Sequence, residues 1–129
     1  MDPAVGVTRE RGSAIVTQRN VNARTLRGML QRGERIALVD VRKREEYAQG
    51  SIPGSVNFDA YDALKAGDGQ AMEEFELPEG TRVVTFCNRG HSGAVAAEQL
   101  RQRGYEAFSL EGGLEAWEGA LRRARAWPA

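Results

Sequence analysis

Cysteine and histidine are nearly missing from this sequence of 129 residues, in which Cys87 and His91 are the only examples. One cysteine cannot form an internal disulfide, which fits a reducing compartment, and we expect a cytoplasmic location. One cysteine and one histidine four positions apart, with no carboxylates clustered beside them, fall short of a zinc set. We therefore expect no bound metal and no cofactor.

Long hydrophobic runs and an excess of one charge are also missing. No apolar run approaches the ~20 residues of a membrane span. Residues 1–14 contain no continuous hydrophobic segment, so no secretory signal is expected. Lysine and arginine number 18, as do aspartate and glutamate, so the chain has no overall field that would attract nucleic acid or an anionic membrane. Neither is expected as a partner.

The length suits one domain with a single core. Residues 1–13 are polar and without periodicity, and we expect them to form a flexible arm. The domain is expected over residues 14–124, followed by a short tail at 125–129. The basic residues from Arg122 onward are expected to fray.

Apolar runs alternate with helical patterns along the chain. Asn22 is the expected N-cap of a helix that ends at Gly33. A short helical turn is expected at 43–49, a helix at 94–103 that ends before Gly104, and a last helix after Gly112 with Leu114, Trp117 and Leu121 on one face. Strands are expected at Ile15 and Val16 and at residues 36–41, 56–58, 82–86 and 105–110. This alternation predicts an α/β domain with a mainly parallel sheet.

The stretch "TFCNRGHSGAVAA" places Cys87 where a predicted buried strand ends and a helix follows. Ligands bind at this edge of open α/β sheets, and backbone N–H groups there favour negative charge. Arg89 and His91 would add positive potential, while Gly90 lets the loop curl. The pattern favours a cradle for an anionic sulfur. The alternative is a buried cysteine that ends a strand, beside a solvated arginine.

Two segments carry a family resemblance: "LVDVRKREEYAQGSIPGSVNF" and "VVTFCNRGHSGAVAAEQLRQRGYEAFSLEGGLEAW". Together they resemble a single-domain rhodanese, a thiosulfate sulfurtransferase, over residues 14–120. The resemblance implies a five-stranded parallel sheet with helices on both faces. It also implies that Cys87 is the nucleophile and carries a persulfide.

The resemblance extends to the residues around Cys87. The family loop is a cysteine, four residues, and then arginine, serine or threonine, a position that Ser92 fills here. The loop amides would hold the persulfide, and Arg89 would attract the thiosulfate dianion, because a basic residue two positions after the cysteine is similar to thiosulfate-using members. The active-site loop expected on this basis comprises Asn88, Arg89, Gly90, His91 and Ser92.

Other residues are expected to play lesser parts. Asp40 and Arg42 match the family's D-x-R segment and are expected to support the site structurally. Ser51 departs from the commoner wording "GHIPG", and we treat it as neutral. His91 is expected to be an exposed loop histidine, and the alternative is a general base paired with Cys87. Glu45 and Glu46 are expected on a solvated helical face, and Trp117 in the core or a partner contact.

The implied mechanism moves a sulfane sulfur from thiosulfate, or another persulfide donor, through Cys87 to a thiol or cyanide. A protein could be the donor or the acceptor, which leaves a non-catalytic persulfide carrier or docking module as the alternative. A phosphatase or arsenate reductase of the cysteine-loop type needs a longer loop closed by an arginine clamp. The sixth position after Cys87 is Gly93, so that clamp is absent.

Overall fold

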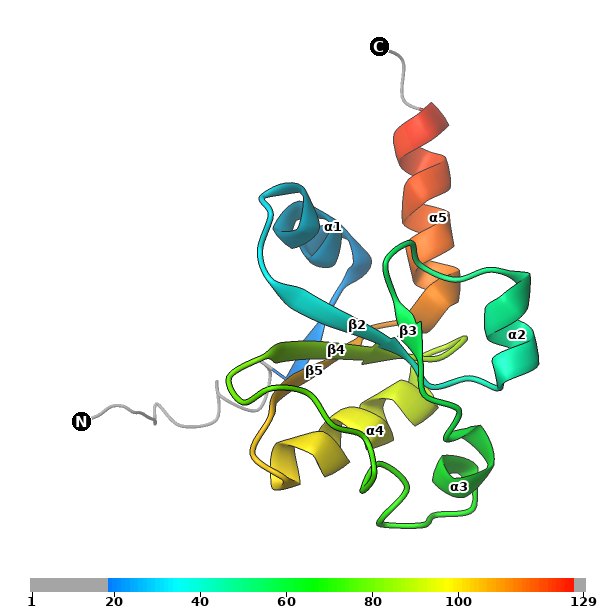
Figure 1. Cartoon of the computed structure of the whole chain (residues 1–129). Helices are drawn as coiled ribbons and strands as arrows, with labels where there is room; N and C mark the ends of the chain where they lie inside the picture. The colour runs from blue at the N-terminus through cyan, green and yellow to red at the C-terminus, as the bar shows by residue number, and fades with distance from the viewer. Residues whose placement is uncertain (1–18, 127–129) are drawn as a thin grey trace.

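A computed structural model describes residues 19–126 of the chain. Five strands form one parallel sheet in the order β1-β5-β4-β2-β3 (Figure 1). The strands are β1 (Asn20–Val21), β2 (Ile36–Asp40), β3 (Val56–Asn57), β4 (Arg82–Phe86) and β5 (Glu106–Leu110). The helices are α1 (Ala23–Gln31), α2 (Arg44–Gln49), α3 (Tyr61–Lys65), α4 (His91–Gln102) and α5 (Gly113–Ala126). The predicted α/β class and five-stranded parallel sheet are confirmed.

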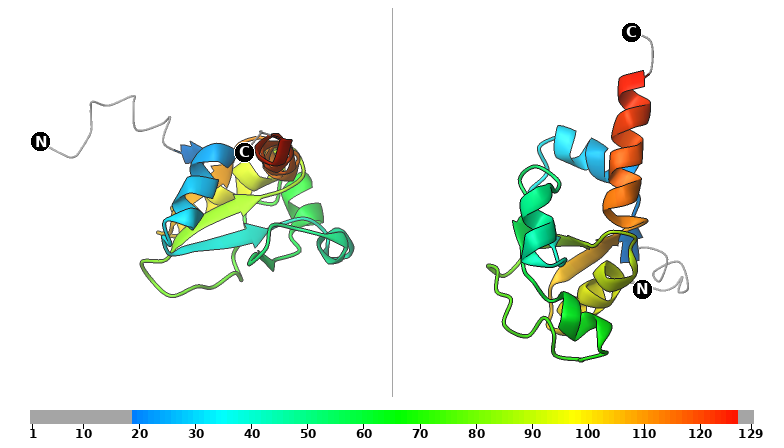
Figure 2. Two further views of the ribbon diagram at one scale, coloured as in Figure 1. Left: turned by 90° about the horizontal axis from the view of Figure 1, so that it is seen from above. Right: turned by 90° about the vertical axis from the view of Figure 1, so that its right-hand side faces the viewer.

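Helices cover both faces of the sheet, α1 and α5 on one side and α3 and α4 on the other (Figure 2). The central strand β4 alternates between the two cores: Val83 packs with α4, whereas Val84 and Phe86 pack with α1 and α5. These side chains are fully buried on both faces, which explains why β4 reads as a continuous apolar run. None of the helices within residues 19–126 is long and apolar enough to cross a membrane.

The expected helix boundaries hold best where a capping residue marks them. Asn22 caps α1 by accepting a hydrogen bond from the Thr25 amide at 2.8 Å, and Gly33 follows the helix with a φ of 79°. A side-chain oxygen at this position satisfies one of the amides that the first helical turn leaves without a partner. The boundary was predictable because this capping chemistry is local.

Four expectations need correction or fall outside the described residues. The first strand is Asn20–Val21, and the expected strand at Ile15 and Val16 lies outside the described residues. The helix expected from Ala94 begins at His91, because Gly90 turns the backbone with a φ of 117°. The last helix continues through Arg122 to Ala126, where we expected fraying. The arm at 1–13 also lies outside the described residues, and the domain limits remain a prediction.

Candidate active site

Cys87 lies directly after β4, at the carboxyl edge of the sheet. Its Sγ atom accepts hydrogen bonds from the Gly90 amide at 3.1 Å and from the Gly93 amide at 3.3 Å. The residue is 5% exposed and packs against the first turns of α4. Two amide donors and the positive end of a twelve-residue helix therefore converge on the sulfur. Donors in this arrangement suit a negatively charged sulfur, and the expected cradle for an anionic sulfur remains a prediction.

Gly93 belongs to this site, although in the sequence it stands out only as a position without the arginine clamp. A Cβ atom at Gly93 would lie 3.0 Å from the Cα of Phe86 and 3.3 Å from the Cys87 nitrogen. Glycine thus lets α4 approach the end of β4 closely enough for its amide to reach the sulfur. The sequence did contain a signal for this role, because glycine within the first turn of a helix lowers helix stability. A glycine in such a position indicates that close packing requires it.

Asn88 is held from both sides. Its Nδ2 donates to Glu46 Oε2 at 3.0 Å, and its Oδ1 accepts from Arg42 Nη1 at 3.4 Å. The expectation that Glu46 only faces solvent was wrong, because α2 carries its carboxylate to the loop. The contact joins residues 42 positions apart, so no local pattern announced it.

Asp40 and Arg42 form a buried ion pair beneath the loop. The carboxylate of Asp40 is fully buried and receives Arg42 Nη2 at 2.8 Å and Nε at 3.0 Å, and Arg42 also donates to the Gly50 carbonyl at 2.7 Å. The hydrogen bond to Asp40 raises the pKa of Arg42 above its ordinary value, against the opposing effect of burial. Arg42 therefore stays charged, and its hydrogen bonds to Asp40 fix the guanidinium that holds Asn88.

Ser51 supports the same pair. Its hydroxyl donates to Asp40 Oδ2 at 2.7 Å and lies 3.0 Å from the Ser55 hydroxyl. Treating Ser51 as neutral was therefore wrong for this chain. The hydroxyl supplies a donor to a carboxylate that water cannot reach.

Replacing Ser51 with alanine should lower the free energy of unfolding by about 1–2 kcal/mol, because a buried carboxylate loses one of its hydrogen bonds. Urea unfolding followed by circular dichroism would measure the change. Ser51→Thr keeps the hydroxyl and serves as the matched control. Equal stability of the wild type and the alanine variant would show that the hydroxyl contributes nothing to the pair.

The other residues of the expected active-site loop do not all lie in the loop. The side chain of Arg89 is 84% exposed, and its Nε lies 3.2 Å from Glu115 Oε2. His91 is exposed, as expected, but it is the first residue of α4. Ser92 is buried in the same helical turn. The structure thus places only Cys87, Asn88, Arg89 and Gly90 in the loop itself.

The turn at Gly112 and Gly113 packs against the backbone of the Cys87 loop. The amides of Leu114 and Glu115 donate to the carbonyl oxygens of Cys87 and Asn88 at 2.8 and 3.0 Å. Gly113 has a φ of 61°, and a Cβ there would lie 2.5 Å from the Cys87 carbonyl oxygen. The start of α5 therefore fixes the backbone of the nucleophile. Trp117, one turn further on, is buried in the core as expected.

Comparisons with known proteins agree with this geometry. The pattern of the rhodanese-like domain matches residues 22–120. A putative sulfurtransferase of Bacillus subtilis, YtwF, is 29% identical over 81% of this chain and 94% of its own length. The solved structure of the human single-domain sulfurtransferase TSTD1 is 34% identical, covers 78% of this chain and 96% of its own, and superposes with a TM-score of 0.62.

A third relative is much longer. The tRNA sulfurtransferase of Desulfurococcus amylolyticus is 32% identical over 68% of this chain, but the matched part is 16% of that protein. The present chain thus spans about a sixth of that relative.

Proposed function

Because the chain belongs to the family of rhodanese-like domains, we propose that it is a sulfurtransferase that moves sulfane sulfur from thiosulfate through a persulfide on Cys87. The observation that carries the proposal is the pair of amides, Gly90 and Gly93, that donate to Sγ of the only cysteine. Donors in these positions hold the sulfur of Cys87 and would stabilise the negative charge of a persulfide formed there.

The reaction has two steps that balance in atoms and charge. The Cys87 thiolate attacks the outer sulfur of thiosulfate, the sulfur–sulfur bond of the donor breaks, and sulfite leaves with the electron pair. The outer sulfur of the persulfide then passes to a thiolate or to cyanide, which restores the Cys87 thiolate. Two successive half-reactions through one covalent intermediate predict ping-pong kinetics.

A steady-state comparison of thiosulfate, mercaptopyruvate and polysulfide as donors, with cyanide as acceptor, tests the assignment. We expect the highest kcat/KM with thiosulfate. A higher value with mercaptopyruvate would overturn the choice of donor but keep the persulfide, whereas failure of all three would overturn the sulfurtransferase.

The second candidate is a persulfide carrier that receives sulfur from a protein. The observation that favours it is the ion pair between Arg89 and Glu115, which weakens the attraction of the loop cation for a small dianion. Slow turnover with thiosulfate, together with fast transfer from a persulfide-bearing protein, would favour the carrier. The free cysteine supports a reducing compartment for either function, and a cytoplasmic location is part of the proposal.

A phosphatase has no support at this site. Gly93 occupies the position of the required clamp, and the buried guanidinium of Arg42 is already bound to Asp40 and to the Gly50 carbonyl. Oxyanion binding of that kind needs an arginine whose donors are free to bind the substrate in a bidentate manner.

Arg89→Ala should raise KM for thiosulfate about threefold to tenfold and leave kcat nearly unchanged, because an exposed charge acts on the dianion equally before and after transfer. The Glu115→Gln variant frees Arg89 and should lower KM instead. Initial rates at two salt concentrations measure both effects, which should shrink as salt rises. A fall in kcat at constant KM would assign Arg89 to the departing sulfite.

A further inference from the structure

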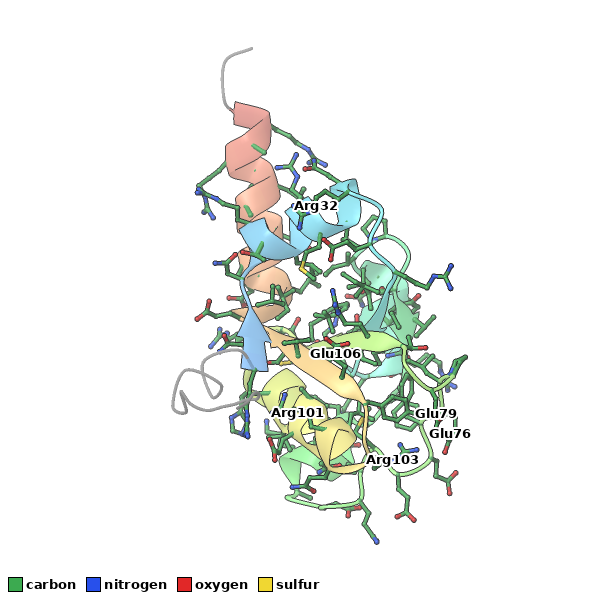
Figure 3. All side chains as sticks on the ribbon, turned by 90° about the vertical axis from the view of Figure 1, so that its left-hand side faces the viewer. Arg32, Glu76, Glu79, Arg101, Arg103 and Glu106 are labelled. Atoms are coloured by element: carbon green, nitrogen blue, oxygen red, sulfur yellow. The ribbon has the colours of Figure 1, made fainter. Side chains whose placement is uncertain are left out.

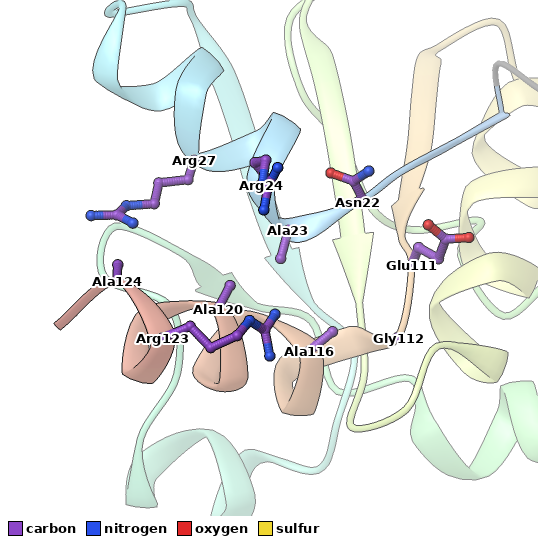
Figure 4. Close-up of a pocket in the computed structure, with 10 residues that line it drawn as sticks. All are labelled: Asn22, Ala23, Arg24, Arg27, Glu111, Gly112, Ala116, Ala120, Arg123 and Ala124. Carbon is purple, nitrogen blue, oxygen red and sulfur yellow. The ribbon is translucent and has the colours of Figure 1, made fainter. Parts of the chain in front are cut away.

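A groove of about 810 Å³ separates α1 from α5 on the face of the sheet opposite α4. Its floor consists of the small side chains of Ala23, Ala116, Ala120 and Ala124, which Figure 4 shows between the two helices. An alanine side chain ends at Cβ, so the helices leave a hollow where longer side chains would interdigitate.

Three arginines line the groove, Arg24 and Arg27 from α1 and Arg123 from α5. Within residues 19–126, none of their guanidinium groups forms an ion pair or a hydrogen bond. Glu111 is the acidic side chain at one end. Several other arginines are paired, as in Arg32–Glu34 at 2.9 Å and Arg101–Glu98 at 2.7 Å. Arg103 lies 2.9 Å from Glu76, and Figure 3 labels both residues. What distinguishes the groove is that its three arginines, which have no partner among the described residues, lie together on two facing helices.

The charge of the groove is therefore local. The whole chain is neutral, and α1 contains two arginines and no acidic residue. Unpaired arginines on facing helices attract an anionic partner and can bind carboxylates in a bidentate manner.

One end of the groove reaches the back of the active-site loop. Glu111 and Gly112 line that end, and the residues that follow donate their amides to Cys87 and Asn88. A molecule that fills the groove would lie against the turn that fixes the nucleophile.

We propose that this groove docks an acidic segment of a protein that exchanges sulfur with Cys87, an inference that rests on the proposed sulfurtransferase function. The arginines would form ion pairs with the carboxylates of that segment, and the alanine floor would contact its aliphatic side chains. Single-stranded nucleic acid fits less well, because bases bind by stacking on aromatic side chains and, within residues 19–126, no aromatic residue lines the groove.

The test measures binding of a fluorescein-labelled helical peptide of glutamate and alanine by anisotropy at low salt. The groove variant carries Arg24→Gln and Arg123→Gln, one change on each helix. The control variant carries Arg35→Gln and Lys65→Gln, which remove the same charge from exposed positions outside the groove. We expect about tenfold weaker binding by the groove variant and less than a twofold change in the control. Turnover of thiosulfate with cyanide should be unchanged in both.

Three results would overturn the proposal. The wild type could fail to bind the peptide, the two variants could weaken binding equally, or a single-stranded RNA of matched charge could bind more tightly through the same arginines. Binding is measured without a sulfur donor and can be repeated on Cys87→Ser. A failure to bind the peptide would therefore contradict the docking groove but not the sulfurtransferase activity. Loss of turnover with intact peptide binding would contradict the sulfurtransferase activity but not the docking groove.

Discussion

Replacing Cys87 with serine should reduce turnover of thiosulfate by at least about 1,000-fold, because a serine hydroxyl is a far weaker nucleophile than a thiolate at neutral pH. The chain has no second cysteine that could take over the sulfur. Thiocyanate formation from thiosulfate and cyanide measures the loss.

Intact mass spectrometry gives the complementary result. The wild type incubated with thiosulfate should gain the mass of one sulfur atom, which cyanide or a reductant removes, and Cys87→Ser should gain none. The serine oxygen can still accept hydrogen bonds from the Gly90 and Gly93 amides, so the variant is expected to fold. Turnover by the serine variant at a rate near the wild type would show that Cys87 does not carry the sulfur.

The side-chain charges around Cys87 nearly cancel. Arg42 is paired with Asp40, Arg89 with Glu115, and Glu46 lies against Asn88 as a further acid. Stabilisation of an anionic sulfur therefore depends on the backbone amides and on the N-terminus of α4, which point at Sγ whatever the neighbouring side chains are. The sequence suggested a larger contribution from Arg89 than this pairing allows.

Elements with strong local signals were predictable from the sequence. The buried strands β2 and β4 are continuous apolar runs, and α1 is marked by Asn22 at its start. The strand β1 has only two residues, and its place is set by pairing with Ser109 and Leu110 of β5. No periodicity can appear in two residues, so only the folded chain reveals that strand.

The nucleophile was predictable from the sequence, whereas the residues that hold it in place were not. Cys87 stands alone in the sequence at the end of an apolar run, within a pattern that resembles a known family. Glu46, Ser51 and Gly113 act through contacts with Asn88, Asp40 and the Cys87 carbonyl, which are distant along the chain. Such roles follow from the packing of elements and leave no mark in the local pattern.

Gly113→Ala should be the most damaging substitution among those that leave the nucleophile in place. The new Cβ would lie 2.5 Å from the Cys87 carbonyl oxygen and 2.6 Å from that of Asn88, both of them backbone atoms. Relief of these contacts moves the loop, and a small misplacement of the reacting sulfur costs about 100-fold in kcat/KM. The clash and the left-handed backbone together should lower the free energy of unfolding by about 2–4 kcal/mol.

A matched control separates the clash from the backbone conformation. Gly33 also has a positive φ, 79°, but a Cβ there meets nothing within 4 Å. Gly33→Ala should therefore cost only about 1 kcal/mol of stability and leave kcat/KM unchanged. Urea unfolding and thiosulfate turnover of both variants measure the difference. If Gly113→Ala matches Gly33→Ala in both measurements, the start of α5 does not hold the Cys87 loop in place.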